Sequence, residues 1–359
     1  MTDKKSMYYN DYLQLDKVLN AQHPESFKEG NEPAHDEMLF IIIHQAYELW
    51  FKQILFELDF IMNVFKKNKI DDNSEDLNLV RHRLNRIIKI LGLLTQQITL
   101  LDTMTPLDFL EFRNLLIPAS GFQSVQFRLI EARLGLQMDN RYNKAYYKRT
   151  NEGGFDRADY NKINDTESTT NLLSLINDWL ARMPFFENDL WENYENQFPV
   201  ENNLHPFWSD YRHIYKSSLN EKEANKINDF DLIFIENSKE VQDDSSIEKP
   251  LLSAEAMRAA LFIMLYRDFP VFQTSYQILD GLVETDHQMA NWRDKHLNMV
   301  RRMIGMRIGT GNTSGRGYLQ GALDQHYIFR DIAGLSTFLI ERKKIPKLPE
   351  ELIRKLSYN

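Results

Sequence analysis

Two histidines of this chain stand on apolar helical faces, where polar side chains are uncommon. His296 lies on the face that also carries Trp292 and Met299. His44 follows Phe40 by one helical turn inside a long apolar segment. Neither histidine has a second histidine three or four residues away, so a two-histidine zinc or non-haem iron site is not supported. Each is either a core histidine whose ring nitrogens are satisfied by neighbours, or a lone ligand of the kind that haem iron needs.

An arginine stands in similar surroundings. Arg113 lies in the segment LDFLEFRNLL, where Phe109 and Phe112 flank it. Such an arginine commonly extends to the surface or pairs with a carboxylate. The alternative is a planar clamp that binds the carboxylate of a small substrate through two parallel hydrogen bonds.

A glycine-rich segment, GTGNTSGRG at residues 309–317, superficially resembles a phosphate-binding loop. No strand pattern precedes it and the GK[ST] ending is missing, so nucleotide binding is not supported. We expect its glycines to allow a close approach of the backbone to a ligand, or a turn with positive φ.

Composition argues against several other classes of protein. The chain has 359 residues, a net charge of −9 and no cysteine. The negative charge argues against a general nucleic-acid binder, and the lack of cysteine excludes disulfides, thiolate zinc sites and thiolate-ligated haem. The opening residues contain no apolar run typical of a secretion signal, and no apolar stretch approaches the roughly 20 residues that cross a bilayer. We therefore expect a cytoplasmic protein.

Apolar residues recur at helical spacing along most of the chain, which predicts an all-α helical bundle that forms one domain over residues 1–359. The chain contains only 14 glycines and 11 prolines, the residues that most often interrupt helices, and it shows no strand pattern or internal repeat. Residues 151–165 are expected to form a loop, and residues 185–250 an inserted, partly mobile helical region. Helices are expected at residues 35–65, 77–101, from 106 onwards with an interruption at Pro118, and at 252–266, 285–306 and 324–340.

Several long segments resemble, in the same order, the signature segments of the tryptophan 2,3-dioxygenase family. They are HDEMLFIIIHQAYELWFKQ (35–53), FLEFRNLLIPASGFQSVQFRLIE (109–131), WRDKHLNMVRRMIG (292–305) and GTGNTSGRGYL (309–319), with YNDYLQLDKVLNAQHP (9–24) and LSTFLIERKKIPK (335–347) also similar. The resemblance spans nearly the whole chain and is weakest over residues 140–250. It implies an all-helical enzyme with one haem b per subunit. Such an enzyme inserts both atoms of O₂ across indole C2–C3 of L-tryptophan to give N-formyl-L-kynurenine, the first step of tryptophan catabolism by the kynurenine route.

The resemblance also implies roles for individual residues. His296 matches the axial ligand of the haem iron, and Arg113 matches the residue that binds the substrate carboxylate. His44 matches the catalytic-site histidine that contacts the indole N–H. Because that group is a very weak acid, we expect His44 to position the indole rather than to act as an essential base. The other matches are Phe40, Phe109 and Thr310 beside the substrate, and Ser120 and Gly121 beside the haem.

The N-terminal segment, residues 1–30, is implied to lie between subunits. Tyr9, Tyr12 and Leu13 match residues that reach into a neighbouring subunit's pocket, in a family whose members are typically homotetramers built as dimers of dimers. The same tyrosines would equally suit ordinary anchoring of an amphipathic helix to its own subunit.

Three residues depart from the family pattern. The loop usually reads GTGGSSG, whereas Asn312 and Thr313 occupy its middle here, and Gln320 replaces a usual arginine. These changes bear on substrate affinity and specificity more than on haem binding. They leave two alternatives open: a related haem-dependent monooxygenase acting on a substituted indole or another aromatic amino acid, and a non-catalytic helical binding protein.

Overall fold

The computed structural model describes residues 6–67, 75–136, 141, 154–200, 204–235, 249–305, 307 and 315–356. Every regular element within these ranges is an α-helix or a 3-10 helix, which confirms the all-α class. The Gly-rich residues 308–314, including Thr310, Asn312 and Thr313, lie outside the described residues.

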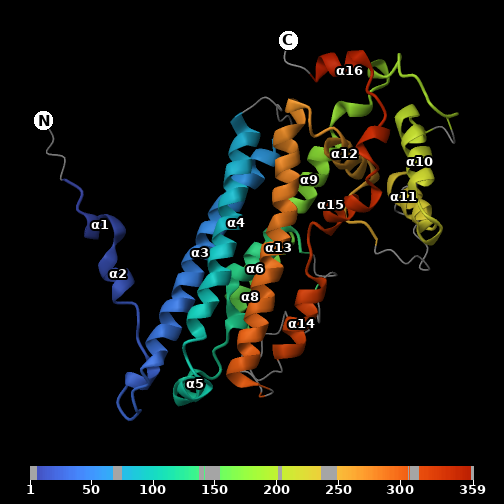
Figure 1. Ribbon diagram of the computed structural model, residues 1–359. Coiled ribbons are helices and arrows are strands. Elements are labelled where there is room, and N and C mark those ends of the chain that lie inside the picture. Colours follow the sequence, from blue (N-terminus) through green and yellow to red (C-terminus); the bar gives the residue numbers. More distant parts are fainter. Residues whose placement is uncertain are drawn as a thin grey trace, which may run out of the picture.

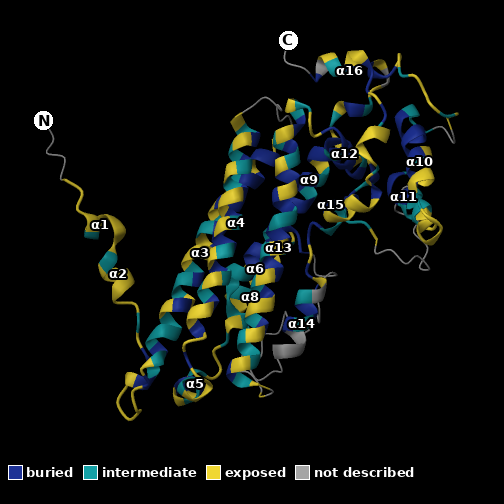
Figure 2. Cartoon of the chain, viewed as in Figure 1, coloured by how far each residue is buried: buried dark blue, intermediate teal, exposed yellow. Residues whose placement is uncertain are grey.

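Three long helices run side by side and form the body of the molecule (Figure 1). They are α3 (Asp36–Phe65), α4 (Glu75–Leu101) and α13 (Pro270–Ile304). Their apolar stripes face one another, as Figure 2 shows by the buried inner faces and exposed outer faces. α13 approaches α4 closely at Gly281, where a Cβ atom would stand 2.7 Å from Cδ2 of Leu84. A larger residue there would force the Leu84 side chain to move.

Shorter helices close the lower half of this bundle. α5 (Pro106–Arg113) begins with a capping box, in which Thr105 and Asp108 bond each other's backbone N–H groups, and with Pro106 in its first turn. After the 3-10 helices η2 (Asn114–Leu116) and η3 (Gly121–Gln123), α6 (Val125–Leu134) begins at the N-cap Ser124. α8 (Arg157–Glu167) packs on α6, and α14 (Gly315–Gln325) packs on α13.

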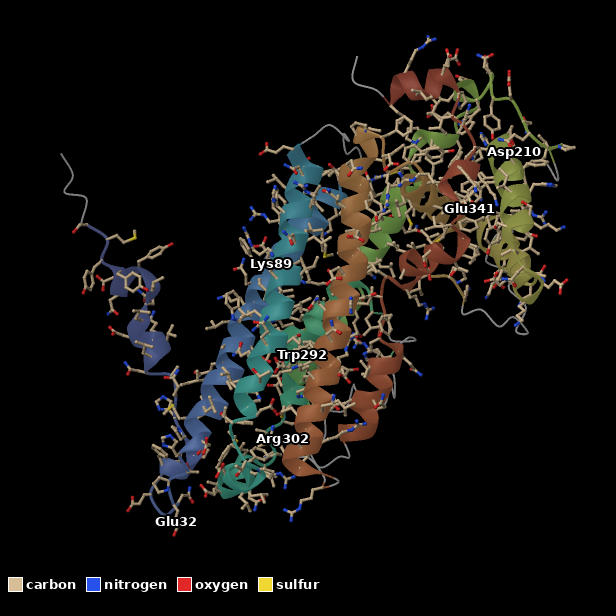
Figure 3. The ribbon with its side chains drawn as sticks, in the orientation of Figure 1. Glu32, Lys89, Asp210, Trp292, Arg302 and Glu341 are labelled. Atoms are coloured by element: carbon tan, nitrogen blue, oxygen red, sulfur yellow. The ribbon has the colours of Figure 1, made fainter. Side chains whose placement is uncertain are left out.

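The upper half is built around aromatic side chains. Its helices are α9 (Leu172–Ala181), η5 (Pro184–Phe186), η6 (Asn188–Leu190), α10 (Pro206–Ser218), η7 (Glu221–Glu223), α11 (Lys226–Phe234), α12 (Ala254–Leu265), α15 (Arg330–Gly334), η9 (Leu335–Phe338), η10 (Arg342–Lys344) and α16 (Glu350–Lys355). Phe207, Tyr211 and Phe262 are fully buried and belong to the same apolar core as the long helices. Asp210 on α10 (Figure 3) accepts hydrogen bonds from the Tyr194 hydroxyl and from the backbone N–H groups of residues 197 and 198.

The N-terminal arm stands apart from this body (Figure 1). It carries α1 (Tyr9–Leu13) and α2 (Leu15–Leu19), neither of which contains a buried residue. The chain joins the bundle at η1 (Glu25–Phe27), where the buried Glu37 carboxylate accepts the backbone N–H groups of Glu25 and Ser26. Within the described residues, the arm therefore contacts the bundle at its C-terminal end.

Three of the expected element boundaries were wrong. α13 begins at Pro270 rather than near residue 285, because proline suits a first helical turn and residues 272–282 already bury an apolar stripe. Residues 157–167 form α8 instead of a loop, with Asp156 as its N-cap. The single helix expected at 324–340 is broken after Gln325, and α15 follows at Arg330–Gly334. At this break the Phe329 N–H donates to the buried Asp286 carboxylate at 2.5 Å instead of continuing a helix.

Among the described residues, no single helix is long and apolar enough to cross a membrane. One pair of helices, Glu75–Leu101 with Pro106–Leu116, meets the same length and composition limits only when counted together across a 92° bend.

Candidate active site

A cavity of about 580 Å³ lies in the lower half of the bundle, between α3, α5, α6, α13 and α14. This volume falls within the roughly 300–1,000 Å³ typical of ligand and cofactor sites. Its walls are mostly apolar, with a few polar groups that converge from different helices. Those polar groups include His44, Ser120, Gln123, Arg113, Arg128, Glu131, Arg293, His296 and His326.

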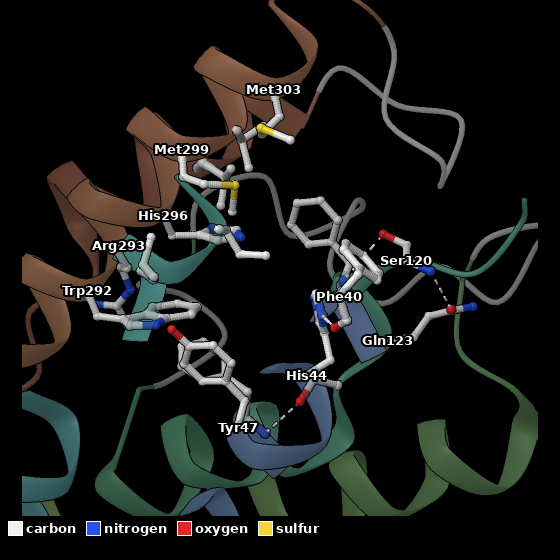
Figure 4. A pocket seen from close by; sticks show the side chains of 18 of the residues that line it. Phe40, His44, Tyr47, Ser120, Gln123, Trp292, Arg293, His296, Met299 and Met303 are labelled. Carbon is white, nitrogen blue, oxygen red and sulfur yellow. Dashed lines mark hydrogen bonds between the residues drawn. The ribbon is translucent and has the colours of Figure 1, made fainter. Parts of the chain in front are cut away.

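His296 projects from α13 into this cavity (Figure 4). Its ring stacks on Trp292, one turn earlier on the same helix, with ring centroids 5.0 Å apart and planes 5° apart. Burial, with a smaller contribution from nearby His44, lowers the pKa of His296 to about 4. The imidazole is therefore neutral at pH 7, which is the form that binds a metal. Its Nδ1 is buried and has no hydrogen-bond partner among the described residues.

His44 enters the cavity from α3, facing the wall that carries His296 (Figure 4). Its Nδ1 lies 2.7 Å from the carbonyl oxygen of Phe40. The ring can be reached through the cavity, but the protein packed around it lowers its pKa, so the neutral form is favoured. A neutral ring that donates Nδ1–H to this carbonyl presents the lone pair of Nε2 to a ligand.

Arg113 ends α5 and is 9% exposed at the cavity wall, so it does not extend to the surface. Phe40 and Phe109 also line the cavity, with ring centroids 5.7 Å apart. The Phe40 ring lies 4.1 Å from that of His44. The cavity thus combines an aromatic wall, a neutral histidine acceptor and a guanidinium.

Comparison with known proteins identifies the family. The model of the family described as tryptophan 2,3-dioxygenase matches residues 1–339. A protein named tryptophan 2,3-dioxygenase from Bdellovibrio bacteriovorus is 39% identical over 98% of this chain and 98% of its own length. Proteins of the same name from Dictyostelium discoideum and Aedes aegypti are 40% and 41% identical, over 99% and 98% of this chain and 89% and 90% of their own lengths. This chain belongs to the tryptophan 2,3-dioxygenase family.

Membership of the tryptophan 2,3-dioxygenase family implies a haem cofactor, and the cavity fits one. The cavity has apolar walls that suit a planar apolar group such as the porphyrin; they are formed by Met299, Val300, Met303, Ile98 and Leu101. His296, whose ring is neutral, is the one histidine among the residues of α13 that line the cavity. Among the described residues, no group of three or more His, Cys, Asp or Glu side chains could hold a metal ion. Histidine is a common axial ligand of haem iron.

Ser120 and Gly121, expected beside the haem, lie on the cavity wall. Ser120 caps η3, since its hydroxyl accepts the Phe122 N–H and its own N–H donates to Oε1 of Gln123 at 2.9 Å (Figure 4). No described atom lies within 4 Å of the position that a Cβ of Gly121 would occupy. The protein itself would therefore tolerate a side chain there, and the cavity is what a side chain would narrow.

Three of the expected residues, Tyr9, Tyr12 and Leu13, do not line this cavity within one chain. Tyr9, Tyr12 and Leu13 are exposed on the N-terminal arm, Tyr9 and Tyr12 by 69% and 68%. Thr310 lies outside the described residues, as do the departures Asn312 and Thr313. Gln320, the third departure, accepts a hydrogen bond from Arg301 of α13 at 3.1 Å.

Sequence reasoning missed a group of buried ions at one end of the cavity. His326 falls near the start of the helix expected at 324–340 and was not singled out, yet its side chain is fully buried. Glu131, Arg128 and Arg293 lie with it and also line the cavity. The charged residues Arg128, Glu131 and Arg293 lie in helices, where a charge is ordinary on a solvated face, so no local signal predicts the group.

Proposed function

We propose that this chain is a haem-dependent tryptophan 2,3-dioxygenase, which adds both atoms of O₂ across indole C2–C3 of L-tryptophan and forms N-formyl-L-kynurenine. The observation that carries the proposal is the convergence of His296, His44 and Arg113 on one cavity from three helices, in a chain of this family. We also expect it to act in the cytoplasm, the reducing compartment that a cysteine-free chain suits.

His296 would hold the iron of one haem b per subunit, through the nitrogen that faces the cavity. The bound haem supplies the activation of O₂, while the protein orients the substrate and excludes water. Because the pKa of His296 is about 4, the ring needs no deprotonation to act as a ligand at neutral pH. The stacked Trp292 restricts rotation of the imidazole about its side-chain bonds.

The opposite wall would bind L-tryptophan. Arg113 provides the planar pair of N–H donors that a carboxylate accepts, and Phe40 and Phe109 provide an apolar surface for the indole. With Nδ1–H donated to the Phe40 carbonyl, Nε2 of His44 accepts the indole N–H. This hydrogen bond sets the orientation of the ring without removing its proton. Thr310 is proposed to complete the contact with the amino-acid head group.

The exposed side chains of the N-terminal arm suggest that a neighbouring subunit helps to form the substrate site. Met7, Tyr8, Tyr9 and Tyr12 expose large apolar surfaces that their own subunit leaves uncovered. We propose that Tyr9, Tyr12 and Leu13 enter a neighbouring subunit's cavity within a homotetramer arranged as a dimer of dimers.

The test is reconstitution with haem, reduction, and addition of L-tryptophan under isotopically labelled O₂. We expect N-formylkynurenine absorbance and a product that contains both labelled oxygen atoms. A product with one labelled atom would indicate a monooxygenase, and fully haem-loaded protein without product would refute the assignment.

His296→Ala should lose the Soret band of the six- or five-coordinate histidine complex and all activity. His213→Ala is the matched control, because His213 stacks on Phe198 at a ring distance of 3.7 Å on α10 and does not line the cavity. A retained native Soret band in His296→Ala would contradict the assigned ligand.

A further inference from the structure

Glu131 on α6 is the centre of the buried ion cluster at the end of the cavity. Its Oε2 lies 2.7 Å from Nη1 of Arg141 and 3.1 Å from Nη1 of Arg128. Its Oε1 lies 3.0 Å from Nη2 of Arg293 and 3.7 Å from Nδ1 of His326. Both oxygens of one carboxylate are thus used by side chains from separate parts of the chain.

The cluster is buried and charged. Glu131 is 1% exposed, and Arg128, Arg141 and Arg293 are also buried. Burial alone would raise the pKa of Glu131, but Arg141, His326, Arg128 and Arg293 hold it well below the usual range, so the carboxylate is ionised. Burial lowers the pKa of His326 despite the adjacent carboxylate, so its ring is predominantly neutral near pH 7. Buried ion groups of this kind contribute little net stability compared with apolar packing, and a positional role is their better-supported use.

The pair Glu131–Arg293 connects two helices that otherwise have little backbone contact. α6 packs chiefly against α3, α8 and α9, whereas α13 packs chiefly against α4 and α14. Arg293 also donates to the carbonyl oxygen of His326 at 3.2 Å, so its planar group is fixed by two partners. It lies one turn before His296 on the same helix and lines the same cavity.

We propose that Glu131 is a positioning residue for the haem site: by pairing with Arg293 it fixes the rotation of α13 at the turn from which His296 emerges. This inference rests on the proposed haem ligation by His296. It assigns no contact between Glu131 and the substrate. Ligand orientation by groups beyond the ligand itself is a general property of metal sites, and loss of such a group typically costs roughly 10- to 100-fold in activity or affinity.

The test compares ferrous holoenzyme of the wild type with Glu131→Gln, which keeps the shape and removes the charge. We expect the iron–histidine stretching band in resonance Raman spectra to shift or broaden, and kcat per haem to fall roughly 10-fold or more. KM for L-tryptophan should stay within about twofold, since Arg113 and Phe40 lie on α5 and α3.

Glu57→Gln is the matched control. Glu57 is also 1% exposed, pairs with Arg86 at 2.7 Å and Arg83 at 3.5 Å, and does not line the cavity. It should lower the unfolding temperature but leave the iron–histidine band and kcat per haem unchanged. An effect of Glu131→Gln limited to unfolding, as in Glu57→Gln, would overturn the proposal.

Arg293→Lys provides a second test of the proposal if the Glu131→Gln variant does not fold. It keeps the charge but cannot bond both Glu131 and the His326 carbonyl as a planar fork. We expect the same spectral change, and an unchanged band in this variant would also overturn the proposal. Failure of His296→Ala to alter haem ligation would instead refute the proposed function, so the two failures are distinguishable.

Discussion

At the scale of single residues, the cavity separates two kinds of polar group. His296 and His44 are kept neutral by burial, while Arg113 presents a charge at the wall formed by α5. Neutral imidazoles suit metal ligation and hydrogen-bond acceptance, whereas a guanidinium suits a carboxylate. In the proposed function, Arg113 would bind the carboxylate of the substrate and the neutral His44 would accept its indole N–H.

Removal of the guanidinium tests this division. Arg113→Met should weaken L-tryptophan binding by about 2–5 kcal/mol, or roughly 30-fold and more in Kd. Binding of tryptamine, which lacks the carboxylate, should change little. Titration of the two ligands into wild type and variant measures the difference directly. Equal losses for both ligands would mean that Arg113 acts on the cavity as a whole and not on the carboxylate.

Substitution of Gly121 tests whether the cavity needs the free space beside this residue. Gly121→Ala should leave the unfolding temperature near that of the wild type, because no described atom lies within 4 Å of the added Cβ. Haem loading or L-tryptophan affinity should fall several-fold, as measured by Soret absorbance and by titration. Gly334→Ala is the control, because its Cβ also meets nothing within 4 Å and the residue does not line the cavity. Identical behaviour of the two variants would remove Gly121 from the site.

At the scale of elements, α13 carries much of the site's polar chemistry. His296, Arg293 and Asp286 lie on this one helix, and Asp286 fixes the break between α14 and α15 by accepting the Phe329 N–H. The rotation and position of α13 therefore affect the proposed haem ligand His296, the ion cluster around Glu131 and the chain that follows α14.

Asp286 gives this helix a measurable pH dependence. Burial raises the pKa of Asp286 to about 6, against the opposing effects of two backbone N–H groups and Arg293. A carboxyl whose pKa is higher in the folded state stabilises the fold below its unfolded pKa, and this contribution is lost as pH rises through 6. Relative to Asp286→Asn, the wild type should therefore lose about 2 kcal/mol of unfolding free energy between pH 4 and 7. Urea unfolding at several pH values measures this difference, and a flat difference would contradict it.

At the scale of the whole molecule, the described part of the N-terminal arm buries no residue of α1 or α2 against its own subunit. The aromatic side chains of α1, Tyr9 and Tyr12, are exposed and do not line the cavity of their own subunit. An exposed apolar segment on a tether is typical of an element that is buried in an assembly.

Subunit mixing tests whether the arm serves a neighbour. A Tyr9→Ala/Tyr12→Ala variant should lose most of its activity with little change in unfolding temperature, because α1 buries nothing. Co-assembly of this variant with His296→Ala subunits should restore part of the activity, since intact arms then reach intact haem sites. Each variant assembled alone is the control. The absence of rescue in verified mixed oligomers would place the arm's effect within its own subunit.

Much of the fold followed from the sequence. The boundaries of α3, α4 and α5 agree with the apolar spacing and with Thr105-Pro106, because these signals act between residues a few positions apart. The break after Gln325 could not be predicted, since it depends on Asp286, which lies 43 positions before Phe329. The helix predicted at 324–340 was therefore continued through Phe329, where the backbone N–H bonds to the distant Asp286 carboxylate instead of to a helical carbonyl.

By itself, the sequence determined that the chain is helical, that His296, His44 and Arg113 stand in unusual surroundings, and which family its motifs resemble. Only the tertiary structure brought these three side chains to one cavity and placed Glu131 against Arg293, 162 positions along the chain. The physical reason is the distance along the chain over which each kind of interaction acts. Periodicity and capping depend on near neighbours, whereas the burial of a charge is stabilised by partners that only the folded chain supplies.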